Sequence, residues 1–341
     1  MRIFFNKKRK ALSVLIASFL LVSTCLSGCG EDEKTAETTA AEETANEEPA
    51  DHEKTVPVEN SSMQSESTVI AVGQTPVTYS EYKSYYYFME NQYDSLLGDQ
   101  VWKQSAGGNK TIGQEAIEDV LRMIIQVKVI VKEAAKQGIT LEPDEKEDAD
   151  YNAQKLFNSL SEEIVSETMM TAPLLMRIFE ENKLAEKVYR VVTGQAETGV
   201  GSGLSAYRVQ LLYKSAGENR EQVRSETESL QKKIAGSDKN FYTYAKKESE
   251  LPEVETVIGS LDERKNLWMT VTSLRNNVIS PVIEESDGFY LAVVLEKPND
   301  TLNTDYQNSV VTEKQIEAFQ ESYEKWSKNY DVEVSDALLS D

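Results

Sequence analysis

The chain has 341 residues, of which 40% are hydrophobic and 28% charged, and its formal net charge at pH 7 is −22. This length and apolar content allow a sizeable core and about two domains. The acidic excess repels the phosphates of nucleic acids, so we exclude nucleic-acid binding. Either the acidity only keeps the protein soluble, or it also attracts basic polypeptides.

Residues 1–28 are predicted to be a signal peptide. A basic n-region precedes an apolar h-region over residues 11–22, which is shorter than a typical transmembrane helix. The following "LSGC" resembles a bacterial lipobox, which implies cleavage before Cys29 and lipid on its sulfur. An ordinary secretory signal is the alternative. Because Cys25 leaves with the signal, the mature chain has no cysteine free to form a disulfide.

Residues 29–66 are predicted to form a disordered acidic tether. They are rich in Glu, Thr, Ala and Ser and contain almost no large apolar side chain. A flexible segment of this length reaches on the order of tens of ångströms, so it localises a folded body without fixing its orientation. The only histidine of the chain, His52, lies here and is interpreted as linker composition.

Ordered structure is expected from Val69. The stretch "VIAVGQTPVTYSEY" predicts a short strand, a Gly-Gln turn and a helix with Ser80 as its N-cap and Glu81 at its positive end. The aromatic residues of this helix are interpreted as core, with a binding surface as the alternative. They are Tyr82, Tyr85, Tyr86, Phe88 and Tyr93.

A longer helix follows with a capping box at Thr111, apolar residues at helical spacing and a stop at Gly138. Pro143 fits the first turn of the next helix. We interpret the acidic run over 144–150 as a solvated helix start rather than a cation site. Another helix is predicted over 173–192.

These N-terminal pieces resemble a known family. The segments "VIAVGQTPVTYSEY" and "IEDVLRMIIQVKVIVKEAAKQGITLEPDE" resemble the N-terminal chaperone region shared by the bacterial SurA and PrsA families of extracytoplasmic foldases. The resemblance covers most of residues 68–195, and its specificity lies in the order of the pieces. It implies a helical domain that holds non-native secreted polypeptides.

The glycine-rich stretch "TGVGSGLS" is interpreted as an interdomain hinge, since it lacks the flanking strand and helix of a phosphate-binding loop. After it, "YRVQLLYK" predicts a strand, residues 218–234 a helix, "FYTYAKK" a short helix, "SLRNNVISPV" a loop and "GFYLAVVLEK" a closing strand. This order resembles a parvulin domain, the proline isomerase module that is inserted in PrsA and SurA foldases.

Proline isomerisation has to lower an amide rotation barrier of about 18 to 20 kcal/mol. Parvulins surround the rotating bond with two histidines and a small polar or acidic partner. The resemblance places Val209 or Leu211, depending on register, at the first of these positions and Tyr290 at the last. A catalytic role therefore has Tyr290 as its candidate, and the alternative is a degenerate domain in which these residues form a core.

The resemblance also implies an apolar groove for substrate. Its predicted lining residues are Trp268, Met269, Phe289, Tyr290, Val209 and Leu211. Without a histidine here, no histidine-based metal site and no serine-histidine triad is expected. No cofactor is expected either.

The C-terminal segment carries an aromatic stripe. Phe319, Tyr323, Trp326 and Tyr330 follow one another at helical spacing, and the strand-like "YDVEVS" comes next. In the related foldases the C-terminal segment packs on the N-terminal helices. We expect the same docking here, which makes the parvulin-like domain an insertion.

The sequence thus predicts an α+β protein with a mostly helical chaperone domain from residues 67–197 and 301–341. An inserted parvulin-like domain with a small antiparallel sheet occupies 205–298. The resemblances imply a lipid-anchored foldase on the extracytoplasmic face of a bacterial cell membrane that binds unfolded or partly folded secreted polypeptides. An active peptidyl-prolyl isomerase is the first alternative, and a solute-binding or structural lipoprotein is the second. A homodimer is left open.

Overall fold

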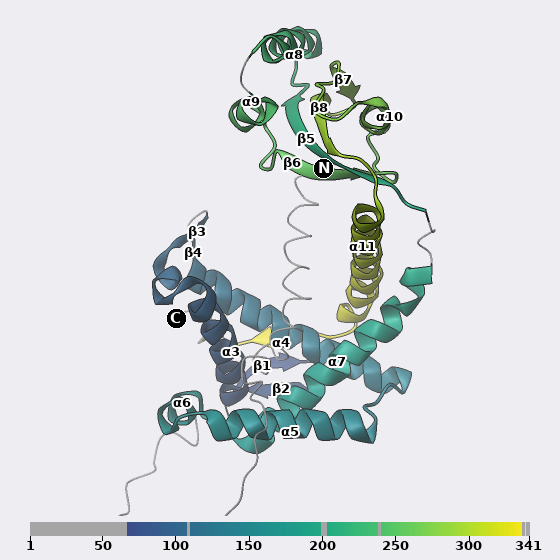
Figure 1. Ribbon diagram of the computed structural model, residues 1–341. Coiled ribbons are helices and arrows are strands. Elements are labelled where there is room, and N and C mark those ends of the chain that lie inside the picture. Colours follow the sequence, from purple (N-terminus) through teal and green to yellow (C-terminus); the bar gives the residue numbers. More distant parts are fainter. Residues whose placement is uncertain (1–66, 108–109, 199–202, 238–239, 336–337, 339–341) are drawn as a thin grey trace, which may run out of the picture. The chain divides into compact units, whose positions relative to one another are not determined.

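The computed structural model describes residues 67–107, 110–198, 203–237, 240–335 and 338. The chain divides into two compact units (Figure 1). Unit 1 runs to Val192 and resumes at Ala318, and unit 2 is Thr193–Glu317. The predicted α+β class, with a helical domain made from both chain ends around an insertion, is confirmed. The predicted signal peptide and tether, with Cys29 and His52, lie outside the described residues.

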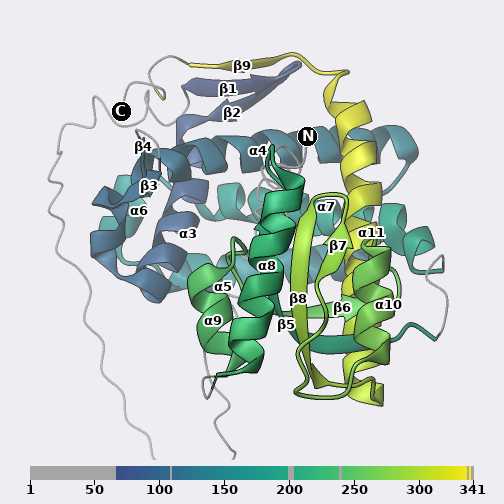
Figure 2. The same ribbon diagram turned by 90° about the horizontal axis from the view of Figure 1, so that it is seen from above.

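A three-stranded sheet joins the two ends of unit 1. Strand β1 (Thr68–Val72) pairs antiparallel with β2 (Thr75–Thr78) on one side and with β9 (Val332–Val334) on the other (Figure 2). Gly73, in the turn between β1 and β2, has a φ of 56°, a backbone conformation that glycine adopts without strain. The first and last described strands are therefore neighbours.

Helix α3 (Tyr79–Leu97) starts earlier than expected. Its N-cap is Thr78, whose hydroxyl accepts a hydrogen bond from the backbone N–H of Glu81. The prediction of Ser80 as N-cap was wrong because Thr78, the last residue of β2, is an equally suitable hydroxyl cap and ends the extended backbone two residues sooner. Ser80 is buried in the first turn instead.

Helix α4 (Ile112–Gln137) has the ends that the sequence predicts. Thr111 and Gln114 form a complete capping box, and Gly138 ends the helix in the left-handed conformation. Within the described part of the chain, no helix is both long and apolar enough to cross a membrane. The other elements of this region are η1 (Asp99–Lys103), β3 (Ser105–Gly107), β4 (Lys110–Thr111), α5 (Pro143–Ser159), α6 (Glu162–Thr168) and α7 (Ala172–Thr198).

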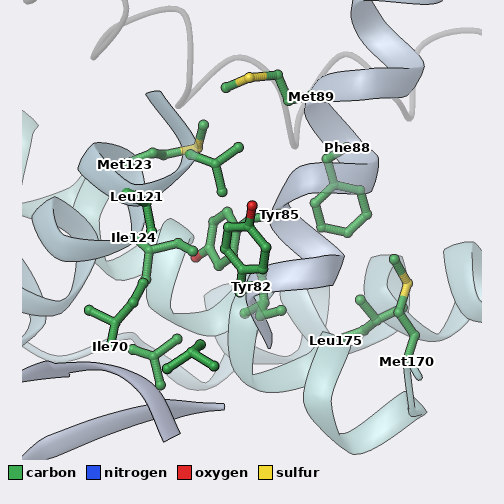
Figure 3. Packing of buried hydrophobic residues seen from close by; sticks show 14 of the residues in the cluster. Ile70, Tyr82, Tyr85, Phe88, Met89, Leu121, Met123, Ile124, Met170 and Leu175 are labelled. Atoms are coloured by element: carbon green, nitrogen blue, oxygen red, sulfur yellow. The ribbon is translucent and has the colours of Figure 1, made fainter. Parts of the chain in front are cut away.

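The aromatic residues of α3 belong mostly to the core. Tyr82, Tyr85 and Phe88 are buried and pack with Ile124 of α4 and Leu175 of α7 (Figure 3). The core interpretation is confirmed for these three rings. The hydroxyl of Tyr85 accepts a hydrogen bond from the side-chain amide of Asn182, so the buried phenol is satisfied.

The C-terminal segment docks on α4 and α7, as predicted. Phe319 of α11 (Asp300–Ser327) is 2% exposed in a buried cluster with residues of both helices, and its ring centroid lies 5.1 Å from that of Tyr189. Beyond the helix end, the hydroxyl of Tyr330 donates to a carboxylate oxygen of Glu133 at 2.7 Å. Apolar and polar contacts together hold this segment on unit 1.

A buried ion network connects α3, α4 and α7. Lys128 Nζ lies 2.7 Å from Glu81 Oε1 and 2.6 Å from Glu181 Oε2. Arg177 donates to the second oxygen of Glu81 at 2.9 Å. Lys128 is 2% exposed and Glu81 is fully buried, so each charge depends on its partners. Burial raises the pKa of Glu181, and Lys128 opposes that shift.

Unit 2 is a four-stranded antiparallel sheet with helices on both faces. The strand order is β6-β5-β8-β7, from β5 (Ala206–Ser215), β6 (Glu255–Gly259), β7 (Ile283–Glu285) and β8 (Gly288–Glu296). Helices α8 (Arg220–Ala235) and α9 (Phe241–Glu248) cover one face, and α10 (Lys265–Ser273) covers the other (Figure 1). The predicted succession of strand, helix, short helix, loop and closing strand is confirmed.

Gly259 leaves room for the first part of α11 to pack beside this sheet. A Cβ on Gly259, at the end of β6, would overlap the ring of Tyr306. The Tyr306 hydroxyl accepts a hydrogen bond from the backbone N–H of Leu261 at 3.2 Å. Any side chain at position 259 would therefore displace this ring.

Truncating the aromatic anchor of the C-terminal segment tests the docking. We expect Phe319→Ala to lower the free energy of unfolding of unit 1 by about 3 to 5 kcal/mol, because it leaves a cavity between α4 and α7. Urea denaturation followed by circular dichroism measures the change. Tyr151→Ala, at a side chain that is 67% exposed, is the control and should change stability by about 0.5 kcal/mol or less. Equal stability of the two variants would contradict the docking.

Removing the buried lysine tests the ion network. We expect Lys128→Met to cost about 3 to 5 kcal/mol, because Glu81 stays buried with one of its two cationic partners gone. Adding Glu81→Gln should recover part of this loss. The measurement is urea denaturation of the single and double variants at pH 7. A single variant as stable as the parent would show that the network contributes nothing.

Candidate functional site

The register of β5 and β8 determines which predicted site residues share a face of the unit 2 sheet. Leu211 lies opposite Ala292, and Tyr213 lies opposite Tyr290. Successive side chains of a strand point to opposite faces, so Phe289 lies on the other face from Tyr290. The guanidinium of Arg220, on α8, lies 5.0 Å from the centre of the Phe289 ring, in agreement with this placement.

The structure therefore brings together four of the six predicted substrate-binding residues. Val209, Leu211 and Tyr290 are buried in one cluster on the α10 face, and Trp268 packs partly buried against it. Phe289 is buried on the opposite face, and Met269 is 60% exposed on α10. A single groove lined by all six is not formed by the described side chains.

The candidate catalytic residue, Tyr290, is held by polar partners. It is 2% exposed, and its hydroxyl donates to Asp287 Oδ2 at 2.9 Å. Its ring centroid lies 4.7 Å from that of Tyr213, and the guanidinium of Arg264 lies 5.5 Å from the ring centre. In this arrangement Tyr290 can hydrogen-bond a substrate carbonyl only if it releases Asp287 and becomes uncovered.

The electrostatics keep Tyr290 protonated. Burial raises the pKa of its phenol, the hydrogen bond to Asp287 raises it further, and Arg264 opposes the shift. Arg264 itself is held by Asp262 through two hydrogen bonds of 2.9 and 2.6 Å. Burial raises the pKa of Asp262, but these bonds from Arg264 leave it below its usual value. Tyr290 can thus offer a neutral hydroxyl as a hydrogen-bond donor.

The partners of Tyr290 are not among the predicted site residues. Arg264 and Asp262 lie just before α10, and Asp287 lies in the turn before β8. An Asp and an Arg two positions apart, just before a helix, were the feature of the sequence that could have indicated this ion pair. In the described ranges there is no histidine and no group of three His, Cys, Asp or Glu side chains that could hold a metal ion.

The family comparison identifies the first part of the chain. Residues 56–184 match the family model of the SurA-like N-terminal domain. The chain therefore carries a SurA-like N-terminal domain, whose described residues lie in unit 1. The resemblance to the SurA family is confirmed over these residues. A comparison with curated proteins found no match.

Solved structures of foldases and chaperones show remote similarity. A peptidylprolyl isomerase (PrsA) from Bacillus anthracis is 14% identical, with 61% of this chain and 94% of that chain covered and a TM-score of 0.33. The foldase PrsA of Streptococcus pneumoniae is 18% identical, with coverages of 70% and 88% and a TM-score of 0.31. A structure from the SurA-like chaperones PEB4 and Cj1289 of Campylobacter jejuni is 13% identical, with coverages of 79% and 98% and a TM-score of 0.27.

The pKa of Tyr290 leads to a prediction about pH. Because this pKa is raised above about 10, its ordinary value, folding retains a proton that the unfolded chain loses. The corresponding stability is fully present below about pH 10 and is lost as the pH rises toward the folded pKa. We expect Tyr290→Phe to reduce the free energy of unfolding of unit 2 at pH 7 by about 1 to 3 kcal/mol, since Asp287 loses its hydrogen bond.

The same variant should lose less stability than the parent above about pH 10, because it has no phenol to ionise at this position. Urea denaturation at a series of pH values from 7 to about 11 measures both effects. Tyr242→Phe, at a tyrosine exposed on α9, is the control and should follow the parent. An identical pH dependence of parent and Tyr290→Phe would exclude the buried donor described above.

Proposed function

We propose that this protein is a lipid-anchored extracytoplasmic foldase whose main activity is to hold non-native secreted polypeptides. The observation that carries the proposal is the SurA-like N-terminal domain in a unit that both ends of the chain complete. The acidic chain, with a net charge of −22, favours basic segments of unfolded polypeptides as partners. No nucleic acid and no cofactor takes part in this function.

The proposal assigns one role to each unit. Residues 67–197 and 301–341 form the chaperone domain, and 205–298 form the parvulin-like domain. The compact units of the structure divide at nearby positions, after Val192 and after Glu317. Both divisions leave unit 2 as a contiguous stretch of chain, in keeping with an inserted module.

We further propose that the parvulin-like domain serves as a binding module or scaffold rather than as an enzyme. No histidine lies in unit 2. Tyr290, the candidate for a catalytic contact, is covered and engaged with Asp287. These observations favour a structural role for Tyr290 over the alternative of an active peptidyl-prolyl isomerase.

The membrane attachment in the proposal rests on the sequence alone. Cleavage before Cys29 and lipid on its sulfur would anchor the chain to the extracytoplasmic face of a bacterial cell membrane. The acidic tether over 29–66 would then let the two units reach clients at a distance from the bilayer.

Two assays on the same preparation test the function. One follows cis/trans isomerisation of a tetrapeptide with an X-Pro bond, and the other follows suppression of aggregation of a reduced, unfolded client. We expect aggregation to be suppressed and the isomerisation rate to equal the uncatalysed rate. Suppression should be insensitive to Tyr290→Phe, provided that the variant is folded.

A rate above the uncatalysed one that is lost in Tyr290→Phe or Trp268→Ala would overturn the binding-module assignment and establish a histidine-free isomerase. Failure to suppress aggregation, with saturable stabilisation by one small molecule, would instead favour a solute-binding lipoprotein.

A further inference from the structure

Unit 2 contains a pocket that the predicted site does not use. It has a volume of about 370 Å³ and lies on the face of the sheet that α8 and α9 cover, away from Tyr290 and α10. Its apolar wall includes Ile234 of α8, Phe241 of α9 and Val293 of β8. None of the residues that line it is ionisable. A pocket of this kind selects an uncharged, largely apolar group.

Three carboxamide side chains complete the lining: Gln210, Asn240 and Asn277. Gln210 donates one side-chain N–H to a carboxylate oxygen of Glu255 at 2.9 Å, which leaves its oxygen and its second N–H for a ligand. Asn240 uses its oxygen to cap α9, so its amide nitrogen is the group it can offer. The pocket therefore presents both a hydrogen-bond acceptor and a donor.

Asn277 is placed by its backbone. Its φ is 60°, a left-handed conformation that asparagine tolerates better than most residues. Its backbone N–H donates to the carbonyl of Val294 at 2.9 Å, which ties this turn to β8. Within the ranges described, the Asn277 side chain has no hydrogen-bond partner. Asn277 is itself exposed, so the fold holds its carboxamide open to solvent where it lines the pocket.

We propose that this pocket binds one apolar side chain of a non-native polypeptide, while the carboxamides hydrogen-bond to the peptide groups beside it. A carboxamide matches a peptide group donor for acceptor, and a neutral lining in an acidic protein discriminates against charged ligands. The volume is near the lower end of the range of about 300 to 1,000 Å³ for ligand pockets, which suits one residue and its backbone. This inference rests on the proposed function and names its substrate class.

The test uses the full chain with labelled Ile, Leu and Val methyl groups and three blocked, uncharged pentapeptides. Each peptide has leucine, phenylalanine or serine at its centre and glycine and serine around it. We expect the leucine and phenylalanine peptides, and not the serine peptide, to shift the methyl signals of Ile234, Ile279, Val293 and Leu295 in a saturable way. The signals of Val209 and Leu211, on the other face, should stay unchanged.

Asn277→Gly separates binding from folding. Glycine accepts the left-handed backbone at position 277, so the fold should be kept while the carboxamide is lost. We expect the affinity for the leucine peptide to fall about 2- to 10-fold, the usual range for one hydrogen bond. Asn266→Ala on α10, which removes a carboxamide and its hydrogen bond to the carbonyl of Glu284 on the opposite side of the sheet, is the control and should leave the affinity unchanged.

Several outcomes would overturn the proposal. Shifts confined to Val209 and Leu211 would move peptide binding to the predicted face. Equal binding of the serine peptide would remove the need for an apolar side chain. If deletion of residues 1–66 changed the methyl signals of the pocket residues in the absence of peptide, the occupant would be residues 1–66 of this chain. Suppression of client aggregation, measured alongside, distinguishes the two failures: if it persists while no peptide shifts the pocket signals, only the pocket inference fails.

Discussion

The antiparallel pairing of β1 with β9 is the interaction on which unit 1 depends. A hairpin such as β1 and β2 is marginal alone in water, and a third strand gives it a partner on its open edge. In the unfolded chain this pairing closes a loop of roughly 260 residues, at an entropic cost on the order of 5 kcal/mol, and β9 contributes only three residues to it. The buried aromatic contacts of Phe319 and the hydrogen bond from Tyr330 to Glu133 are therefore part of the same closure.

The buried ion network restricts how the helices of unit 1 pack against one another. Apolar contacts are non-directional, so they allow α3, α4 and α7 to rotate against one another at modest cost. The buried ion pairs favour one packing of the three helices, because a rotation that separates Lys128 from Glu81 and Glu181 leaves a charge in the core without its partner. In the same way, Asp262 and Arg264 fix the start of α10 beside Tyr290. Each unit thus combines an apolar core with a polar cluster that limits the alternative packings of its helices.

The sequence was informative where local chemistry decides the structure. The capping box at Thr111 and the stop at Gly138 depend on neighbouring residues, and both are present. The N-cap of α3 was misplaced because Thr78 and Ser80 are chemically alike, and only the end of β2 decides between them. Lys128 lies on α4, but its partners Glu81 and Glu181 lie on α3 and α7, so no local pattern reveals the network. The docking of the aromatic stripe came from the family resemblance, because periodicity shows an apolar face without showing what covers it.

The site was harder to predict than the fold for a similar reason. Adjacent residues of a strand lie on opposite faces, so Phe289 and Tyr290 cannot line one groove, although they are neighbours in the sequence. The pocket of unit 2 was missed because its walls come from α8, α9, β8 and the turn at Asn277, and none of these segments carries a motif.

The division into a contiguous and a discontinuous unit also sets a time order for synthesis. All strands of unit 2 are synthesised before the second half of α11, whereas unit 1 is complete only once β9 has been synthesised. The part of the unit 1 core that Phe319, Tyr323 and Trp326 cover therefore stays without its final partners until α11 has been made. Until then the nascent chain exposes apolar surface of the kind that chaperones recognise.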